Sequence, residues 1–523
     1  MTISGLELES AVRDRLLAFT REHTLERLWR GDVTVWVDDP DAPEIADRLG
    51  WLTIGSLMAA EVESLRRFAA EAAQAFDRVV LLGMGGSSLA PEVLWRAFGP
   101  QDGFPAFRML DSTHPNAVRT VLEDAPLERT LFLVASKSGT TVETDSLYRF
   151  FWERAGRRGA QFVAITDPGT ALDRLAADRG FLRTFRNPPD IGGRFSALSF
   201  FGLVPAALMG LDIAVLLTRA EEMAHRCSAE VSVADNPGAT LGVALAEAAR
   251  AGRDKLTMLL APEFAPFGLW VEQLVAESTG KEGRGILPVV CEPLDASVPY
   301  RDDRFFVAMA GRRPATMLDE RVRGIEARFE PLVRLTLQDE LDLAAEFFRW
   351  EMATAVAGAV LRINPFDQPN VAESKRRTRD VLVSGAAAAK PTLLRREDVA
   401  AFLGAVRPGD YVAVQAYVAP GADGDERLRR LCGALRERLG AVVTTGYGPR
   451  YLHSTGQLHK GGPPTGHFIQ VVDAPAADLP IPGADYGFAA LIAAQAEGDL
   501  LALRARGRPV LRAGDPADLL ELL

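Results

Sequence analysis

Short apolar runs alternate with amphipathic stretches along much of the chain. Between residues 51 and 190 such runs occur at 78–82, 107–110, 130–135 and 161–165, and helical patterns separate them. Uninterrupted apolar runs are typical of parallel strands that are buried on both faces of a sheet. Their alternation with helices predicts a doubly wound parallel-sheet domain over residues 51–190.

The same alternation continues through the rest of the chain. Apolar runs at 255–261, 286–290, 305–310 and 332–337 predict a second doubly wound parallel-sheet domain over residues 191–383. After an alanine-rich joint at 384–390, a smaller C-terminal α/β unit is expected over residues 391–523, with strands at 411–417 and 441–445. Residues 1–50 are predicted to form a helical lead-in that includes a short strand near 29–37. The predicted fold class is therefore α/β.

Composition restricts the possible partners. The 523 residues are 48% hydrophobic and 25% charged, which is typical of a globular protein with an ample core. The formal net charge of −11 argues against a nucleic acid or an anionic membrane as partner. An anionic substrate must therefore be bound by positive charge that is placed locally.

One apolar stretch, 197–217, is long enough to cross a bilayer. Because Pro205, Gly210 and Asp212 interrupt it, we expect a buried helix followed by a second segment, and no membrane partner. The first residues form an amphipathic pattern that differs from a signal peptide. The three cysteines are far apart and fit neither a disulfide framework nor a metal-binding spacing, which favours a cytoplasmic location.

Two polar loops follow neighbouring predicted strands. The run 130–135 ends in SKSGTT, with four hydroxyl groups and one glycine, and the run 78–82 continues into GMGGSS. A loop between a strand and a helix presents free N–H groups and a positive helix end, which suits a phosphate group. Either loop alone could merely cap a helix, but two at one sheet edge predict a phosphate-binding crevice. The residues expected to bind substrate there are Gly86, Ser87, Ser136, Lys137, Ser138, Thr140 and Thr141.

Three further motifs lie in the second predicted domain. The segment DIGGRFS places Arg194 directly after two glycines. In QLVAESTGKEG, Gln273 and Glu277 are four residues apart, so both project from one face of the predicted helix. The segment NPFDQP contains Gln368, and Lys375 follows that glutamine by seven residues. Taken singly, each charged side chain would be interpreted as an ordinary surface group.

Together with the loops GMGGSS and SKSGTTVET, these motifs resemble those of the glucose-6-phosphate isomerase family. The resemblance implies two sugar isomerase domains, a sugar phosphate as small-molecule substrate, and no metal or organic cofactor. It implies Glu277 as the base that moves a proton between C1 and C2, Arg194 as the electrostatic partner of the enediolate, and Lys375 as a contact of the ring-oxygen region. Gln273 and Gln368 are implied as further substrate-binding residues.

The chain departs from the usual order of the family at its histidine. A histidine-bearing segment ordinarily lies between the glutamate and lysine motifs, yet residues 285–364 contain no histidine. The segment YLHSTGQLHKGG of the C-terminal unit supplies His453 instead, with Gln457 at the spacing seen after the family's ring-opening histidine. This arrangement resembles the isomerase half of bifunctional transaldolase/glucose-6-phosphate isomerases, and it implies His453 as the ring-opening group. It leaves open whether His453 acts within its own subunit, whether the chain forms a homodimer, and whether a separate transaldolase associates.

Other functions explain fewer of these residues. A non-catalytic sugar-phosphate regulator could share the two loops, but it would not need Glu277, Lys375 and His453 together. A dinucleotide oxidoreductase would explain the glycines at 83–86, but not SKSGTT or the glutamate motif. No cysteine or acid cluster accompanies the histidines of the C-terminal unit, which argues against a metal site there. The resemblance therefore implies an aldose–ketose isomerase that interconverts glucose 6-phosphate and fructose 6-phosphate through ring opening and an enediolate.

Overall fold

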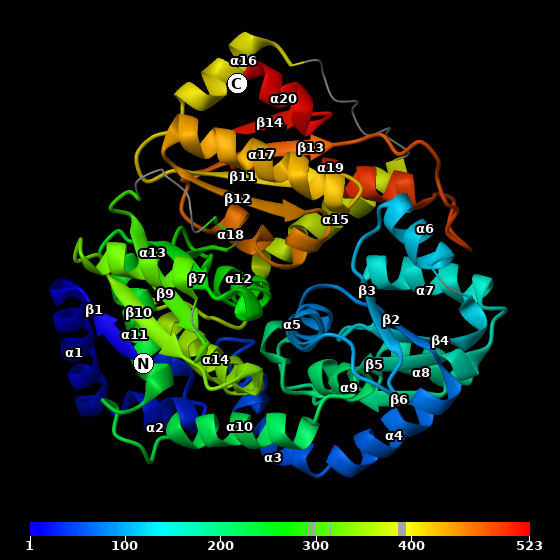
Figure 1. Ribbon diagram of the computed structural model, residues 1–523, viewed down its shortest axis with the longest axis horizontal. Coiled ribbons are helices and arrows are strands. Elements are labelled where there is room, and N and C mark those ends of the chain that lie inside the picture. Colours follow the sequence, from blue (N-terminus) through cyan, green and yellow to red (C-terminus); the bar gives the residue numbers. More distant parts are fainter. Residues whose placement is uncertain (125, 291, 294–299, 314, 385–393) are drawn as a thin grey trace.

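The computed structural model describes residues 1–523 except for 125, 291, 294–299, 314 and 385–393. The described residues form three sheets of five, five and four strands, and each sheet is the centre of one α/β unit. Figure 1 shows the three units arranged around a common centre, with blue and cyan strands in the first, mainly green strands in the second, and orange to red strands in the third. The predicted α/β fold class is confirmed.

The first sheet is entirely parallel, and helices cover both of its faces. In pairing order its strands are β3 (Ala106–Leu110), β2 (Arg78–Leu82), β4 (Thr130–Ala135), β5 (Phe162–Thr166) and β6 (Arg183–Arg186). Its helices are α4 (Val62–Ala75), α5 (Leu89–Phe98), α6 (Pro115–Glu123), α7 (Val142–Arg154) and α8 (Ala171–Asp178). Along β2, Val79 and Leu81 pack with α4 and α5, whereas Val80 and Leu82 pack with α6, α7 and α8. The apolar run of β2 is thus explained by burial on both faces.

The second sheet is parallel except at one edge. Its strands in pairing order are β1 (Thr2–Ser4), β10 (Leu332–Thr336), β9 (Arg304–Ala310), β7 (Lys255–Leu260) and β8 (Leu287–Val289), and β1 alone among them pairs antiparallel. Besides the helices of the first sheet, the helices up to α12 are α1 (Leu6–Arg21), α2 (Thr24–Trp29), α3 (Ile54–Ala59), α9 (Phe200–Leu208), α10 (Ile213–Arg226), α11 (Pro237–Arg250) and α12 (Phe267–Thr279). They are followed by α13 (Thr316–Glu326), α14 (Leu343–Leu361) and α15 (Pro369–Ser384). Since all 19 residues of α14 are buried, this helix lies in the interior of the molecule.

The third sheet is parallel throughout. Its strands in pairing order are β12 (Val442–Tyr447), β11 (Tyr411–Tyr417), β13 (Gly466–Val472) and β14 (Val510–Ala513). The helices of this unit are α16 (Arg396–Gly404), α17 (Ala422–Leu439), α18 (Gly456–Gly461), α19 (Phe488–Ala505) and α20 (Pro516–Leu522). The sequence predicted β11 and β12 but neither β13 nor β14.

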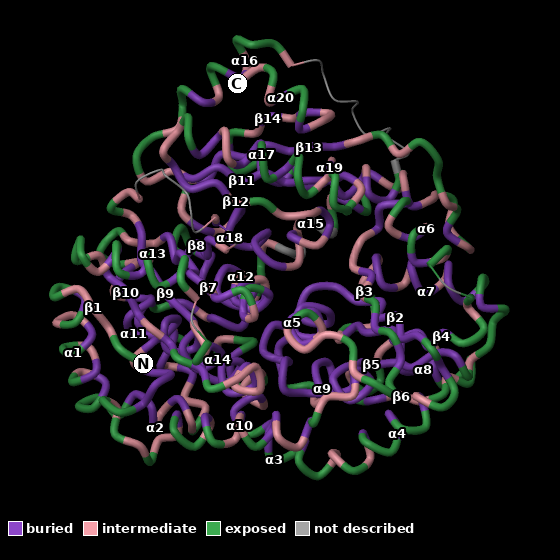
Figure 2. Tube along the Cα trace, viewed as in Figure 1, coloured by how far each residue is buried: buried purple, intermediate pink, exposed green. Residues whose placement is uncertain are grey.

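The third unit packs against both of the others. Ala276 of α12 and Leu287 of β8 share an apolar cluster with Tyr411 and Phe468 of the third sheet. On the other side, the ring of Phe488 in α19 lies 5.6 Å from that of Phe150 in α7. Figure 2 shows buried residues concentrated in the three sheets and exposed residues on the outer helices. The C-terminal unit is therefore fixed beside α5 and α12, where the three units meet (Figure 1).

Several local expectations can now be compared with the structure. The strand expected near 29–37 is wrong: Val33–Val35 form a single 3-10 turn, and the neighbouring Trp36 is buried against Phe366. The stretch 197–217 forms two helices, because the Asp212 carboxylate caps α10 by accepting from two backbone N–H groups. Among the described helices none combines the length and apolarity needed to cross a bilayer. Most of the joint predicted at 384–390 lies outside the described residues, and the domain boundaries stay predictions.

Candidate active site

The hydroxyl-rich loop connects β4 to α7 at the carboxyl edge of the first sheet. The Oγ of Ser136 lies 3.0 Å from the Oγ1 of Thr141, and it accepts from the N–H of Gly139 at 3.1 Å. Gly139 has a φ of +65°, a left-handed conformation that glycine adopts without strain. Ser138 and Thr140 are exposed, and their hydroxyl oxygens lie 3.0 Å apart. The loop thus presents hydroxyl groups beside the N-terminus of α7, which is a favourable position for a phosphate.

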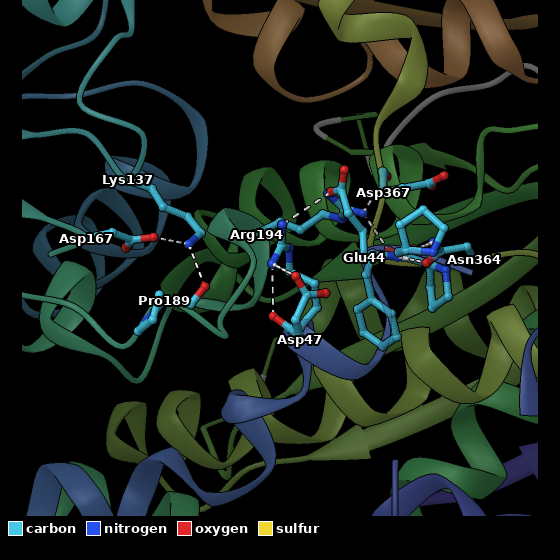
Figure 3. Close-up of polar contacts among 12 residues, drawn as sticks. Glu44, Asp47, Lys137, Asp167, Pro189, Arg194, Asn364 and Asp367 are labelled. Carbon is cyan, nitrogen blue, oxygen red and sulfur yellow. Dashed lines mark hydrogen bonds and ion pairs between the residues drawn. The ribbon is translucent and has the colours of Figure 1, made fainter. Parts of the chain in front are cut away.

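Lys137 points toward Asp167 and Pro189 (Figure 3). Its Nζ forms an ion pair with the carboxylate of Asp167, which follows β5, and donates to the carbonyl of Pro189 at 3.0 Å. Burial raises the pKa of Asp167, and the neighbouring ammonium opposes that rise. The contacts of Lys137 therefore connect the hydroxyl-rich loop to the segment that leads to Arg194, and its predicted role in substrate binding stays a prediction.

The glycine-rich loop after β2 packs directly on the segment that carries Arg194. A Cβ atom on Gly86 would lie 2.0 Å from the carbonyl oxygen of Gly193, so only glycine fits there. A Cβ atom on Gly85 would lie 2.9 Å from both Gln273 Nε2 and the carbonyl oxygen of His453. Ser87, in the same turn, is buried. The glycines of this loop therefore allow three distant segments of the chain to approach one another.

Arg194 is buried and holds several groups together. Its Nε donates to Ser278 Oγ at 2.7 Å, and its NH2 group donates to the carbonyls of Pro365 at 2.6 Å and Asp367 at 3.0 Å. Its NH1 group lies 3.5 Å from Glu277 Oε1. Burial lowers the pKa of Arg194, whereas the carboxylates of Glu277 and Asp367 act in the opposite direction. The guanidinium thus supplies positive charge beside Glu277 in the interior of the molecule.

Glu277 and Gln273 project from the same face of α12, as their spacing predicted. The Nε2 of Gln273 donates to Glu277 Oε2 at 3.0 Å, and also to the backbone carbonyl of His453 at 2.8 Å. Both side chains are buried. The carboxylate of Glu277 therefore lies between the guanidinium of Arg194 and the amide of Gln273, and this fixes its orientation.

Lys281, in the turn after α12, was not singled out as a site residue by the sequence. Its Nζ donates to the carbonyl of Asn364 at 2.5 Å and to that of Asp367 at 2.7 Å, and it forms an ion pair with the carboxylate of Asp367. Burial and the nearby Arg194 lower the pKa of Lys281 to about 8. Figure 3 shows Arg194 beside Asp367 and Asn364, the residues to which Lys281 is bound. Lys281 therefore fixes the segment that receives the hydrogen bonds of Arg194.

His453 reaches this crevice within its own chain. It ends the 3-10 turn Arg450–His453, which follows β12, and its Nε2 lies 3.0 Å from Glu143 Oε1. Glu143 is buried in the first turn of α7, directly after the hydroxyl-rich loop, and it also accepts from Gln495 Nε2 at 2.7 Å. The sequence places Glu143 near the start of this helix, but it gave no reason to assign a role to that acid. The histidine of the third unit is thus adjacent to both α7, which follows the hydroxyl-rich loop, and α12.

A buried cluster of charges holds the histidine turn in place. Arg450 forms ion pairs with Glu92 of α5 and with Asp111, which follows β3 and lies 3.3 Å from its Nε. Burial raises the pKa of Asp111, and Arg450 opposes that rise. Burial also raises the pKa of Glu272 in α12 to about 7, against the effects of Arg450 and of a hydrogen bond from Ser454. Three elements of the first two units therefore converge on the arginine that begins the histidine turn.

The remaining predicted residues are less fully placed. Gln368 is exposed on the wall of a cavity of about 600 Å³ that Glu44, Glu282 and Asp367 also line. Lys375 belongs to α15, but its side chain is outside the part that the structure describes. Near these residues, Gln457 of α18 donates to the carbonyl of Gly280 at 3.0 Å, which connects the third unit to the turn after α12.

No cluster of potential metal ligands occurs among the described side chains. Cys227 and Cys432 are buried and free, and burial raises the pKa of Cys227 to about 12 and that of Cys432 to about 11. Cys291 lies outside the described residues. The crevice holds the carboxylate of Glu277, the guanidinium of Arg194 and the imidazole of His453, and Gln273 connects Glu277 to the backbone of His453. Such groups can exchange protons and stabilise a developing negative charge.

Comparison with known proteins shows which family the chain resembles. The family model of phosphoglucose isomerase matches residues 55–284, which include both loops, Arg194 and Glu277 but neither Lys375 nor His453. The glucose-6-phosphate isomerase of Rubrobacter xylanophilus is 31% identical over 374 residues, which is 61% of this chain and 85% of that protein. That of Methanocaldococcus jannaschii is 27% identical over 58% of this chain and 83% of its own length.

Solved structures show the same fold. A glucose-6-phosphate isomerase from Chlamydia trachomatis superimposes with a TM-score of 0.54 at 21% identity, over 70% of this chain and 78% of its own. A hypothetical protein from Thermus thermophilus superimposes with a TM-score of 0.62 at 23% identity, over 73% of this chain and 99% of its own.

Proposed function

Because this chain belongs to the phosphoglucose isomerase family, we propose that it interconverts glucose 6-phosphate and fructose 6-phosphate. The substrate is then a sugar phosphate, whose phosphate group lies at the hydroxyl-rich loop between β4 and α7. The reaction needs two kinds of proton transfer, one that opens the pyranose ring and one between C1 and C2. It needs no oxidant or reductant, because the two sugars are isomers.

Glu277 is the base in this proposal. A single carboxylate with access to C1 and C2 removes the proton from one carbon and returns it to the other. The enediolate formed between these steps carries negative charge, which the buried guanidinium of Arg194 stabilises. The contact of Arg194 with Glu277, at 3.5 Å, supports this pairing of roles.

His453 opens the ring by transferring a proton between O1 and O5. Its Nε2 lies 3.0 Å from Glu143, whose carboxylate orients the imidazole. Lys375 is placed by its motif near the same ring oxygen. The observation that carries the proposal is the chain of contacts that runs from the backbone carbonyl of His453 through Gln273 to Glu277 and Arg194.

The test is a coupled assay that follows the conversion of fructose 6-phosphate to glucose 6-phosphate without added metal. Glu277→Gln keeps the shape of the side chain but removes the base, and loss of a positioned base lowers turnover by about 10²–10⁴-fold. Glu320→Gln, on the exposed face of α13, is the matched control and should turn over normally. Turnover of Glu277→Gln within a few-fold of the unchanged protein would exclude Glu277 as the base.

Two finer points belong to the same proposal. Since His453 reaches the crevice within its own chain, a monomer should be fully active, and a homodimer would not be required for chemistry. Specific activity that falls on dilution, in parallel with dissociation measured by sedimentation, would contradict this. A cytoplasmic location follows in this proposal from the three scattered cysteines. The resemblance to the isomerase half of bifunctional transaldolase/glucose-6-phosphate isomerases motivates a search for a separate transaldolase partner, and co-sedimentation with such an enzyme would test the association.

A further inference from the structure

A cavity of about 490 Å³ lies on the second unit, away from the groups of the candidate active site. It is bounded by α1, α2, the last turns of α11 and α14, and the turn after α12. Neither Glu277 nor His453 nor Arg194 lines it. Its volume is within the range of about 300–1,000 Å³ that is usual for small-molecule sites in proteins.

The wall of this cavity is strongly basic. It carries five arginines and a single acidic residue, Glu22, although the whole chain has a formal net charge of −11. The five arginines come from four helices or their ends and from the turn after α12: Arg15, Arg27, Arg250, Arg284 and Arg362. Residues that are distant in the sequence are therefore brought together by the fold, and not by a run of like charges.

Ion pairs behind the wall account for only part of this charge. Arg15 Nε and Arg250 NH1 share one oxygen of Glu247, at 2.6 and 3.2 Å. Arg27 pairs with Asp32 at 2.7 Å, and Arg362 pairs with Asp38. These three carboxylates and Glu22 leave the formal balance positive, since five guanidinium groups face four carboxylates.

Contacts within the protein explain three of the arginines: Arg27 donates to Thr34 Oγ1 at 2.8 Å, Arg362 donates to the carbonyls of Thr34 and Val35 at 3.2 Å each, and Arg284 contacts the end of α14. Arg284 donates to the carbonyl of Leu361, the last residue of α14, at 2.5 Å. Within the described part of the chain, Arg15 and Arg250 donate to Glu247, so each keeps most of its five N–H donors for another acceptor. A guanidinium group with free N–H donors can bind two oxygens of one phosphate or carboxylate group at once.

A buried hydroxyl group on the same wall lacks a partner. Thr24 begins α2 and is 5% exposed, and its Oγ1 makes no hydrogen bond with any residue that the structure describes. Because that oxygen is itself inaccessible, the donors that face the cavity are the guanidinium groups and not this hydroxyl.

We propose that this arginine-lined cavity binds a compact anion that carries two or more phosphate or carboxylate groups. The site is a second one, distinct from the phosphate loop between β4 and α7. Because the wall carries only one positive charge more than its carboxylates neutralise, binding depends on hydrogen bonds from several guanidinium groups at once, which an anion with two or more phosphate or carboxylate groups can accept. Pyrophosphate and citrate represent these two kinds of anionic group.

Calorimetric titration of the full chain with pyrophosphate, and separately with citrate, tests the proposal. Changing Arg15 and Arg250 together to Gln should weaken the binding by about tenfold or more, since each charge-assisted hydrogen bond contributes appreciably to affinity. Arg66→Gln is the matched control, because Arg66 pairs with Asp212 at 2.7 Å and is 48% exposed, as Arg250 is. Loop 136–141 is unaltered in each variant, so anion binding there is common to all.

Glu22→Gln should change anion binding in the opposite direction, an effect that misfolding cannot produce. Removing the single acidic group of the wall should tighten binding by several-fold, and isomerase turnover should stay unchanged in all these variants. The site is supported if either anion binds more weakly to Arg15→Gln/Arg250→Gln and more tightly to Glu22→Gln. The proposal is overturned if both anions bind equally to every variant, or if neither binds to the unchanged protein.

Discussion

Arg450→Met removes the charge that holds the histidine turn and keeps a side chain of similar length. In the folded chain Arg450 pairs with Glu92 and with Asp111, both largely buried, and it is followed three residues later by His453. The carboxylates of Asp111 and Glu92 raise the pKa of Arg450 despite the opposing effect of burial, so it is charged in the native protein. The change therefore leaves two acids without their principal cation.

Removing one partner of a buried ion pair costs about 3–5 kcal/mol, because the other charge stays buried and uncompensated. Glu92 keeps a contact with Arg96 at 3.2 Å, and Asp111 can take up a proton because burial already raises its pKa. We therefore expect a loss at the lower end of that range, about 3 kcal/mol of unfolding free energy. Since the lost contacts dock the turn that ends at His453, reaction of cyclic glucose 6-phosphate should slow by at least about tenfold.

Urea unfolding and the coupled isomerase assay measure the two effects. Arg450→Met combined with Asp111→Asn should recover a large part of the lost stability, because the amide needs no counter-charge, and a double-mutant cycle isolates that coupling. Arg427→Met is the control: its ion pair with Asp515 is exposed, so its loss should cost below about 1 kcal/mol. Arg450→Met with stability and turnover like those of the control would refute the reasoning.

Three further changes test other parts of the site. Burial raises the pKa of Glu272 from 4.5 to about 7, so the folded state binds this proton more tightly than the unfolded chain and loses stability as pH rises between those values. Urea unfolding at pH 5 and pH 8 measures that loss, and Glu272→Gln should reduce it by about 1–2 kcal/mol. An unchanged pH dependence would contradict this expectation. Ser138→Ala with Thr141→Ala should weaken the binding of fructose 6-phosphate and of inorganic phosphate alike in calorimetry, with the fold retained by circular dichroism; unchanged binding would make the loop a helix cap only. His453→Ala should slow glucose 6-phosphate by about 10²-fold or more, yet affect 5-deoxyglucose 6-phosphate, which cannot close the pyranose ring, far less; equal effects on both sugars would remove His453 from ring opening.

The local pattern of the sequence was sufficient for the framework of the fold. The run 130–135 forms β4 with the predicted bounds, and Gln273 and Glu277 share a face of α12 as their spacing requires. Both features depend on neighbours within one strand or one helix turn, which the order of apolar and polar residues determines directly. Because the prediction depended on apolar runs, strands without such a run were missed. Examples are β1, which has only three residues, and β6, which has the sequence RTFR.

Only the tertiary structure could decide which distant segments complete the crevice. Glu143 lies 310 residues from His453, and Glu92 lies 358 residues from Arg450, so no local pattern relates either pair. These contacts exist because the third unit packs on the second through its sheet and on the first through α19, which brings the turn after β12 onto α5, α7 and α12. The sequence determined what chemistry the residues can perform. Packing across the three units determined that His453 lies beside Glu143 and Gln273 of its own chain. The reason is that burial and ion pairing act between surfaces that only the folded chain brings together.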